Sequence, residues 1–188
     1  MADAAETDES LMERFAGGAA EAFDELYRRH ELRVWRYLER TVRNRAVADD
    51  LMQDVWFAVA REAGRYRPTA RFTTWLFTLA HNRMIDWLRA ARPHVRLDDP
   101  DEADAVAEFT ADTRPGPLAS TEAAEHAEAL IAAVGQLPAA QQEAFLLQVE
   151  GDLSVEEIAS VTGASFETTK SRLRYARTRL KQLLWEHA

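Results

Sequence analysis

Residues 154–180 read SVEEIASVTGASFETTKSRLRYARTRL and contain two helical segments joined by a glycine turn. Ser154 and Glu157 have the spacing of a capping box, which predicts where the first, short helix begins. Gly163 can adopt the positive φ angle that a tight turn requires, and Ser165 can cap the helix that follows. This arrangement predicts a helix-turn-helix, in which the second helix lies in the major groove of DNA.

The second helix of this motif has an apolar face and a basic face. The apolar positions, which suit packing against the rest of a domain, are Phe166, Thr169, Leu173, Ala176 and Leu180. The basic positions are Lys170, Arg174, Arg177 and Lys181, flanked by Arg172 and Arg179. A basic stripe alone is more often a solvated helix face, but its place after a capped helix and a glycine turn favours DNA binding.

We expect the first part of this helix to contact DNA. Glu167 and Thr168 lie at the end that enters the groove and are candidates to read bases, whereas the arginines suit phosphate contacts. The candidate DNA-binding residues of this segment are Ser165, Glu167, Thr168, Lys170, Ser171, Arg172, Arg174, Tyr175 and Arg177.

Composition limits the other possibilities for this chain. Its 188 residues, 47% of them hydrophobic, are enough for two small domains with buried cores. Without cysteine, the chain has no disulfide and no thiolate metal site. We find no apolar run long enough to span a membrane, and the acidic N-terminus lacks the features of a signal peptide. These observations predict a cytoplasmic protein.

The net charge of −9 is unevenly distributed along the sequence. Residues 65–96 contain seven arginines and a single acid, Asp86, and residues 165–188 contain six basic residues and two acids. The acids gather near the N-terminus and between residues 98 and 112. Because local fields decide where a polyanion binds, two basic segments in an acidic chain favour a nucleic-acid partner.

Hydrophobic residues recur with helical spacing throughout the chain, which predicts an all-α fold. A short first helix, with Ser10 and Glu13 as a possible capping box, ends near Gly17. The other helices are expected at residues 19–43, 46–63, 71–91, 121–136, 138–150, 154–161 and 166–186, with Pro138 in a first helical position. Residues 94–119 are rich in proline and acids, so we predict two small helical domains, 1–93 and 120–188, joined by an acidic flexible linker.

Four stretches of the sequence resemble the extracytoplasmic-function (ECF) branch of the sigma-70 family. They are AFDELYRRH at residues 22–30, ADDLMQDVWFAVARE at 48–62, FTTWLFTLAHNRMIDWLR at 72–89, and TKSRLRYARTRL at 169–180. Each stretch alone is moderately specific for this family. The four together, in the order in which the family has them, are strongly specific for it. The resemblance covers nearly the whole chain, including the linker.

The resemblance implies a sigma factor that directs core RNA polymerase to specific promoters and assists DNA melting. In this interpretation the first domain binds core polymerase and the promoter −10 element, and the second domain binds the −35 element. The linker passes between them, near the path of nascent RNA. An anti-sigma factor that masks the polymerase-docking surface is a further expected partner.

One stretch is similar to the polymerase-docking helix of the family. The resemblance assigns this role to Asp50, Leu51, Gln53, Asp54 and Trp56. Gln53 and Asp54 are expected to be exposed polar contacts, whereas Leu51 and Val55 are expected in the core. A solvated acidic helix remains the alternative interpretation of the aspartates.

The arginine-rich segment carries the residues expected at the −10 element. Aromatic rings among arginines suit single-stranded DNA, because bases stack on the rings and the cations hold the backbone. Core packing is the alternative for Trp75, and Asp86 is spaced to pair with Arg89. Residues 65–70 match the base-capturing loop of the family, and Asn82 matches an asparagine near the −10 bases. The candidates are Arg65, Tyr66, Arg67, Arg71, Phe72, Trp75, Asn82, Arg83, Asp86 and Arg89.

Two other functions were compared with this interpretation. The sequence contains no catalytic motif, and its five histidines are scattered, so we expect neither an enzyme nor a metal or other cofactor. A helix-turn-helix regulator without sigma activity is the stronger alternative. The family often has Gly-Thr-Val at the positions of Glu167, Thr168 and Thr169. This difference leaves undetermined which −35 DNA sequence the helix recognises.

Overall fold

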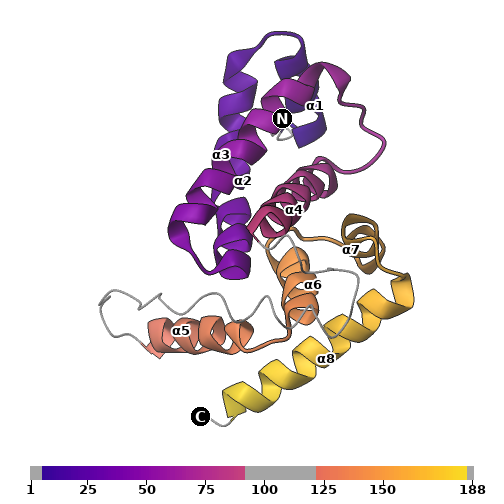
Figure 1. The fold of residues 1–188 in the computed structure, drawn as a ribbon. Helices are drawn as coiled ribbons and strands as arrows, with labels where there is room; N and C mark the ends of the chain where they lie inside the picture. The colour runs from indigo at the N-terminus through magenta and orange to yellow at the C-terminus, as the bar shows by residue number, and fades with distance from the viewer. Residues whose placement is uncertain (1–5, 92–121, 186–188) are drawn as a thin grey trace, which may run out of the picture.

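The computed structural model describes residues 6–91 and 122–185, and this part of the chain is helical without any β-strand. The α-helices are α1 (Asp8–Ala16), α2 (Ala20–Val42), α3 (Arg45–Glu62), α4 (Phe72–Ala91), α5 (Glu122–Gly135), α6 (Ala139–Val149), α7 (Val155–Thr162) and α8 (Phe166–Trp185). A short 3-10 helix, η1 (Ala63–Arg65), follows α3. The predicted all-α class is confirmed (Figure 1), whereas the predicted linker lies outside the described residues.

The start of α1 differs from the prediction. Thr7 is the N-cap, and its side chain accepts a hydrogen bond from the Ser10 N–H at 3.2 Å. Ser10 therefore lies inside the helix, and the predicted capping box of Ser10 and Glu13 was wrong. Pro138 is likewise the N-cap of α6 rather than its first helical residue.

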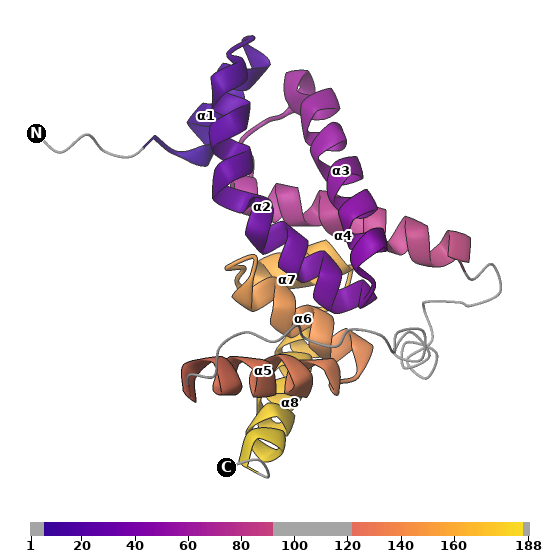
Figure 2. The same ribbon diagram turned by 90° about the vertical axis from the view of Figure 1, so that its left-hand side faces the viewer.

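The first half of the molecule is a bundle of α2, α3 and α4, with α1 packed against α2 and η1 (Figures 1 and 2). Its largest fully buried side chains include Tyr37, Phe72 and Phe77. The Tyr37 and Phe77 rings meet edge to face, with centroids 5.5 Å apart, and join α2 to α4. This aromatic centre fixes the direction of α4 relative to α2 and α3.

In the second half, α8 packs against α5, α6 and α7. Leu146 and Leu147 of α6, Ile158 of α7 and Leu173 of α8 are buried together in this core. The buried leucines hold α7 and α8 as one unit, so the helix-turn-helix has a fixed base.

Polar groups join the two halves. Three carboxylates of the second half, Glu143, Glu150 and Glu157, accept hydrogen bonds from or pair with side chains of α2 and α4. Figure 1 shows α6 and α7 directly beside α2 and α4. The contacts are Tyr37–Glu143 at 3.1 Å, His81–Glu143 at 2.7 Å, Arg40–Glu150 at 2.5 Å, Thr74–Glu157 at 2.5 Å and Arg71–Asp152 at 3.2 Å.

Candidate nucleic-acid and polymerase interfaces

The turn between α7 and α8 has the geometry predicted for a helix-turn-helix. Ser154 Oγ accepts from the Glu157 N–H at 3.2 Å, and Glu157 Oε2 accepts from the Ser154 N–H at 2.8 Å, which completes the capping box. Gly163 has a φ of 66°, and Ser165 Oγ accepts from the Thr168 N–H at 3.1 Å. The predicted cap, turn and second cap are confirmed.

The outer face of α8 gathers most of the predicted DNA-binding residues. Thr169, Leu173, Ala176 and Leu180 are buried, whereas Phe166 is 41% exposed and does not complete the apolar face that the sequence predicted. Ser171 and Arg172 are half-buried. The exposed candidates are Ser165, Glu167, Thr168, Lys170, Arg174, Tyr175 and Arg177.

Two of the cations on this face are already oriented by neighbours. The Arg174 guanidinium lies 4.8 Å from the centroid of the Tyr175 ring. Arg177 donates a hydrogen bond to the side-chain oxygen of Gln148 on α6 at 2.6 Å. The face as a whole is therefore positively charged and partly ordered, which suits a phosphate backbone.

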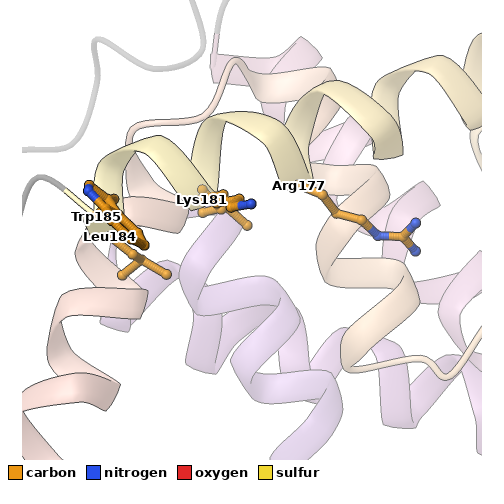
Figure 3. Close-up of a pocket in the computed structure, with 5 residues that line it drawn as sticks. Arg177, Lys181, Leu184 and Trp185 are labelled. Atoms are coloured by element: carbon orange, nitrogen blue, oxygen red, sulfur yellow. The ribbon is translucent and has the colours of Figure 1, made fainter. Parts of the chain in front are cut away.

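The end of α8 carries an apolar surface that sequence reasoning missed. Trp185 is 79% exposed, and a pocket of about 450 Å³ is lined by Arg177, Leu180, Lys181, Leu184 and Trp185. Figure 3 shows Leu184 and Trp185 together near the C-terminal end of α8, with Arg177 extending from the helix closer to its N-terminus. An apolar residue that continues a helical pattern gives no sequence signal of its exposure.

The exposed face of α3 combines polar residues with one aromatic ring. Asp50, Gln53 and Asp54 are exposed, as expected for docking contacts. Phe57, one turn further along the same face, is 71% exposed, although sequence reasoning did not select it. We call Asp50, Gln53, Asp54 and Phe57 the α3 stripe.

Two residues of the predicted docking set lie in the core instead. Leu51 is 4% exposed and Trp56 is 5% exposed. The Trp56 ring packs against Phe23 and Tyr27, with centroid distances of 5.6 and 4.9 Å. In this structure both residues support the α3 stripe from below and are not available to a partner. The expected burial of Leu51 and Val55 is confirmed.

A pocket of about 260 Å³ separates the α3 stripe from α4. It is lined by Asp50 and Asp54 of the stripe, by Val47 and Leu51, and by Arg83, Asp86 and Trp87 of α4. Asp86 lies 3.8 Å from Arg83 and 3.9 Å from Arg89, so the ion pair considered as an alternative role does form. The candidates on α4 thus lie next to the candidate docking surface.

The −10 candidates divide into exposed and buried groups. Arg65, Arg67, Arg71, Asn82, Asp86 and Arg89 are exposed, and Trp75 and Arg83 are half-buried. Tyr66 is only 7% exposed and Phe72 is fully buried, so neither ring is available to stack on a base in this structure. Their rings pack on Trp75, at centroid distances of 5.0 Å for Tyr66 and 5.8 Å for Phe72.

The burial of Tyr66 also affects its titration. Burial, together with the nearby carboxylates of Glu9, Glu13 and Asp8, raises the pKa of Tyr66 to about 12. The phenol stays neutral well into the alkaline range, and its buried ring anchors the loop that follows it.

Comparisons with known proteins place this geometry in a family. Residues 26–94 match the family model for Sigma-70 region 2, and residues 127–180 match that for Sigma-70, region 4. The RNA polymerase sigma factor CarQ of Myxococcus xanthus is 37% identical over 176 residues, which cover 93% of this chain and 96% of CarQ. The chain belongs to the sigma-70 family of RNA polymerase sigma factors.

A second relative places the chain in the ECF branch of the family, and two solved structures share its fold. The ECF RNA polymerase sigma factor SigM of Mycobacterium tuberculosis is 32% identical, over 95% of this chain and 85% of SigM. Among solved structures, CnrH in complex with the cytosolic domain of CnrY has a TM-score of 0.66 at 23% identity, over 97% of this chain and 100% of that chain. RpoE in complex with NepR from Bartonella quintana has a TM-score of 0.67 at 23% identity, over 86% of this chain and 96% of that one.

The family assignment decides between a sigma factor and a regulator without sigma activity. It supports an ECF sigma factor that directs RNA polymerase to promoters, rather than a helix-turn-helix regulator without sigma activity. In the described residues of this sigma factor, no helix is both long and apolar enough to cross a membrane.

Proposed function

We propose that this sigma factor divides its work between three exposed surfaces. The α3 stripe binds core RNA polymerase, the outer face of α8 binds the −35 element, and α4 with residues 67–71 binds and helps to melt the −10 element. The observation that carries the proposal is the position of these surfaces. The α3 stripe and α4 lie within the region 2 match, and α8 lies within the region 4 match except for its last residues.

The α3 stripe supports a protein partner through its composition. Three polar residues and an exposed phenylalanine on one face form a small apolar contact with a polar surround. Aromatic anchors of this kind account for much of the binding energy in protein interfaces. Trp56 and Leu51 hold the stripe in place from the core side.

The outer face of α8 supports binding to duplex DNA. The helix follows a short capped helix and a turn, and Ser165, Glu167 and Thr168 are exposed around its N-terminus. In a helix-turn-helix these N-terminal positions reach base edges, and the cations further along suit phosphates. Glu167 can accept a hydrogen bond from the amino group of a cytosine.

The exposed part of α4 supports contact with the −10 element. Asn82 projects a polar amide from a helix that carries few acids, and Arg71 and Arg89 add positive charge near its two ends. An exposed asparagine can form two hydrogen bonds with an adenine edge. The half-buried Trp75 offers part of one aromatic ring beside these groups.

The remaining elements of the proposal concern regulation and location. We expect the protein to act in the cytoplasm, where core polymerase and promoter DNA are found. We also propose that an anti-sigma factor restrains it. The solved structure of RpoE, whose fold this chain shares, is in complex with the anti-sigma factor NepR, and that of CnrH is in complex with the cytosolic domain of CnrY. Domain boundaries at residues 93 and 120 belong to the same proposal.

Transcription in a reconstituted system tests the proposal. The full chain is added to purified core polymerase and a promoter library, and the transcripts are sequenced. A sigma factor is sufficient to produce specific transcripts, whereas a regulator also requires a housekeeping sigma factor. The absence of specific transcripts with core polymerase alone would contradict the proposal.

A further inference from the structure

A carboxylate from a distant helix caps the N-terminus of α4. The backbone N–H of Phe72, the first residue of α4, donates a hydrogen bond to Glu9 Oε1 at 2.7 Å, across 63 residues of sequence. The first N–H groups of a helix have no partner within the helix, and its N-terminus attracts negative charge. Because α4 has no acidic residue in its own first turn, the Glu9 carboxylate supplies this charge from α1.

The loop before α4 is held at both of its ends. Tyr66 is buried at one end, and Phe72 is buried and bonded to Glu9 at the other. The five residues between them, 67–71, are all exposed. The loop therefore lies at the surface with its ends fixed on the core, and in this structure its last residue, Arg71, also contacts Asp152 of the second half.

The helix that carries Glu9 is itself firmly placed. Leu11 and Met12 of α1 are buried at 2% and 0% exposure. Asp8, next to Glu9, accepts a hydrogen bond from Arg29 at 2.8 Å and lies 2.7 Å from the His30 ring nitrogen. Glu9 consequently approaches α4 from a rigid element rather than from a free terminus.

We propose that Glu9 is a positioning residue for promoter melting. By fixing the first turn of α4, it holds residues 67–71 in the conformation that receives unpaired −10 DNA. Capture of an unstacked base is energetically unfavourable, and a loop that is ordered in advance loses less entropy on binding. This inference rests on the proposed role of α4 at the −10 element.

Two substitutions separate the charge from the hydrogen bond. Glu9→Ala removes both, whereas Glu9→Gln keeps an oxygen that can accept from the Phe72 N–H. Glu21→Ala is the matched control, because it removes an exposed ion pair between α1 and α2, Arg14–Glu21 at 2.9 Å, that does not involve α4. All variants are full-length chains assembled with core polymerase.

Three measurements decide the inference on a promoter found by the transcription assay. They are the affinity for core polymerase, the rate of melting on duplex promoter followed by permanganate, and the affinity of the holoenzyme for the single-stranded −10 segment. For Glu9→Ala we expect core binding within about twofold of wild type. Melting and single-strand affinity should each fall about fivefold, the factor that corresponds to a helix cap of about 1 kcal/mol. Glu9→Gln should be intermediate, and Glu21→Ala should resemble wild type.

Two results would overturn the inference. One is normal melting and single-strand affinity for Glu9→Ala. The other is an equal loss of core binding, melting and single-strand affinity, which would show a purely structural role. A parallel measurement on Asn82→Ala distinguishes a failure of the positioning role from a failure of the proposed role of α4. If Asn82→Ala impairs melting and Glu9→Ala does not, only the positioning role of Glu9 is wrong. If neither substitution impairs melting, the assignment of α4 to the −10 element is wrong as well.

Discussion

Arg40 of α2 donates a hydrogen bond to the Glu150 carboxylate at the end of α6, at 2.5 Å and across 110 residues of sequence. Glu150 is only 5% exposed, so its charge is compensated by this contact rather than by water. With the contacts of Glu143 and Glu157, the pair holds the second half of the molecule against α2 and α4.

If α4 and α8 bind the −10 and −35 elements as proposed, this closed arrangement holds the two surfaces too close together to reach both elements at once. Thr74 of α4 bonds Glu157 of α7 at 2.5 Å, and Ser165 lies eight residues after Glu157. Eight residues span at most about 29 Å, whereas two turns of DNA measure roughly 70 Å. Residues 94–119 lie outside the described residues, but a chain of that length can span at most about 94 Å at roughly 3.6 Å per residue, which is longer than this distance.

We therefore predict that breaking the Arg40–Glu150 pair favours an open form. Glu150→Gln leaves the Arg40 guanidinium without its buried counter-charge, which should weaken the contact between the halves. Small-angle scattering should show a larger radius of gyration than for wild type. Glu128→Gln, an exposed position on α5, is the control. Identical scattering from Glu150→Gln and wild type would show that this pair does not hold the halves together.

The α3 stripe should determine the affinity for core polymerase. Gln53→Ala combined with Asp54→Ala removes two exposed polar contacts, and Phe57→Ala removes the exposed ring. Each change should weaken core binding, with the larger effect, on the order of tenfold or more, expected for Phe57. Binding is measured with labelled protein, and circular dichroism should show unchanged helical content. Asp24→Ala, at an exposed position on α2, serves as the control. Wild-type affinity in both variants would show that the α3 stripe does not bind core polymerase.

The cations of α8 should determine the salt dependence of DNA binding. Each lost phosphate contact should reduce the slope of log affinity against log salt by about 0.9. The triple variant Arg172→Ala, Arg174→Ala and Arg177→Ala tests this on duplex promoter DNA over a range of salt concentrations. Arg36→Ala, which removes an exposed arginine on α2, is the control. The phosphate-contact role would be wrong if the triple variant kept the wild-type slope.

Asn82→Ala should impair open-complex formation more than polymerase binding. The side chain is exposed on α4, and a good base-edge contact contributes about 1–3 kcal/mol. Melting on a duplex promoter, followed by permanganate, should therefore decrease between about fivefold and 150-fold. Normal melting together with normal core binding would show that Asn82 does not contact the −10 bases.

Gly163→Ala should destabilise the helix-turn-helix through backbone conformation alone. Gly163 has a φ of 66°, and an added Cβ would meet nothing within 4 Å. The strain of a left-handed conformation costs about 1–2 kcal/mol. Gly64→Ala is the matched control, because that position is equally open and its φ is not in the left-handed region. Thermal denaturation should show a lower Tm for Gly163→Ala only, and equal Tm values for the two variants would contradict the conformational argument.

The helices and the helix-turn-helix could be predicted from the sequence because their signals are local. Capping by Ser154 and Ser165 acts over three residues, and the turn at Gly163 depends on one φ angle. Helical periodicity likewise extends over only a few turns. The predicted start of α1 was wrong although capping is a local interaction, because Thr7 rather than Ser10 provides the cap.

Long-range contacts decided the rest. The burial of Tyr66 and Phe72, and the exposure of Phe57 and Trp185, depend on which helices pack over each ring. The cap from Glu9 to Phe72 joins residues 63 positions apart, and no local pattern marks it. The sequence by itself determined the helices, the turn and the segregated charge. Only the tertiary structure decided which side chains face a partner and which groups join the two halves, because burial and pairing depend on packing between elements distant in the chain.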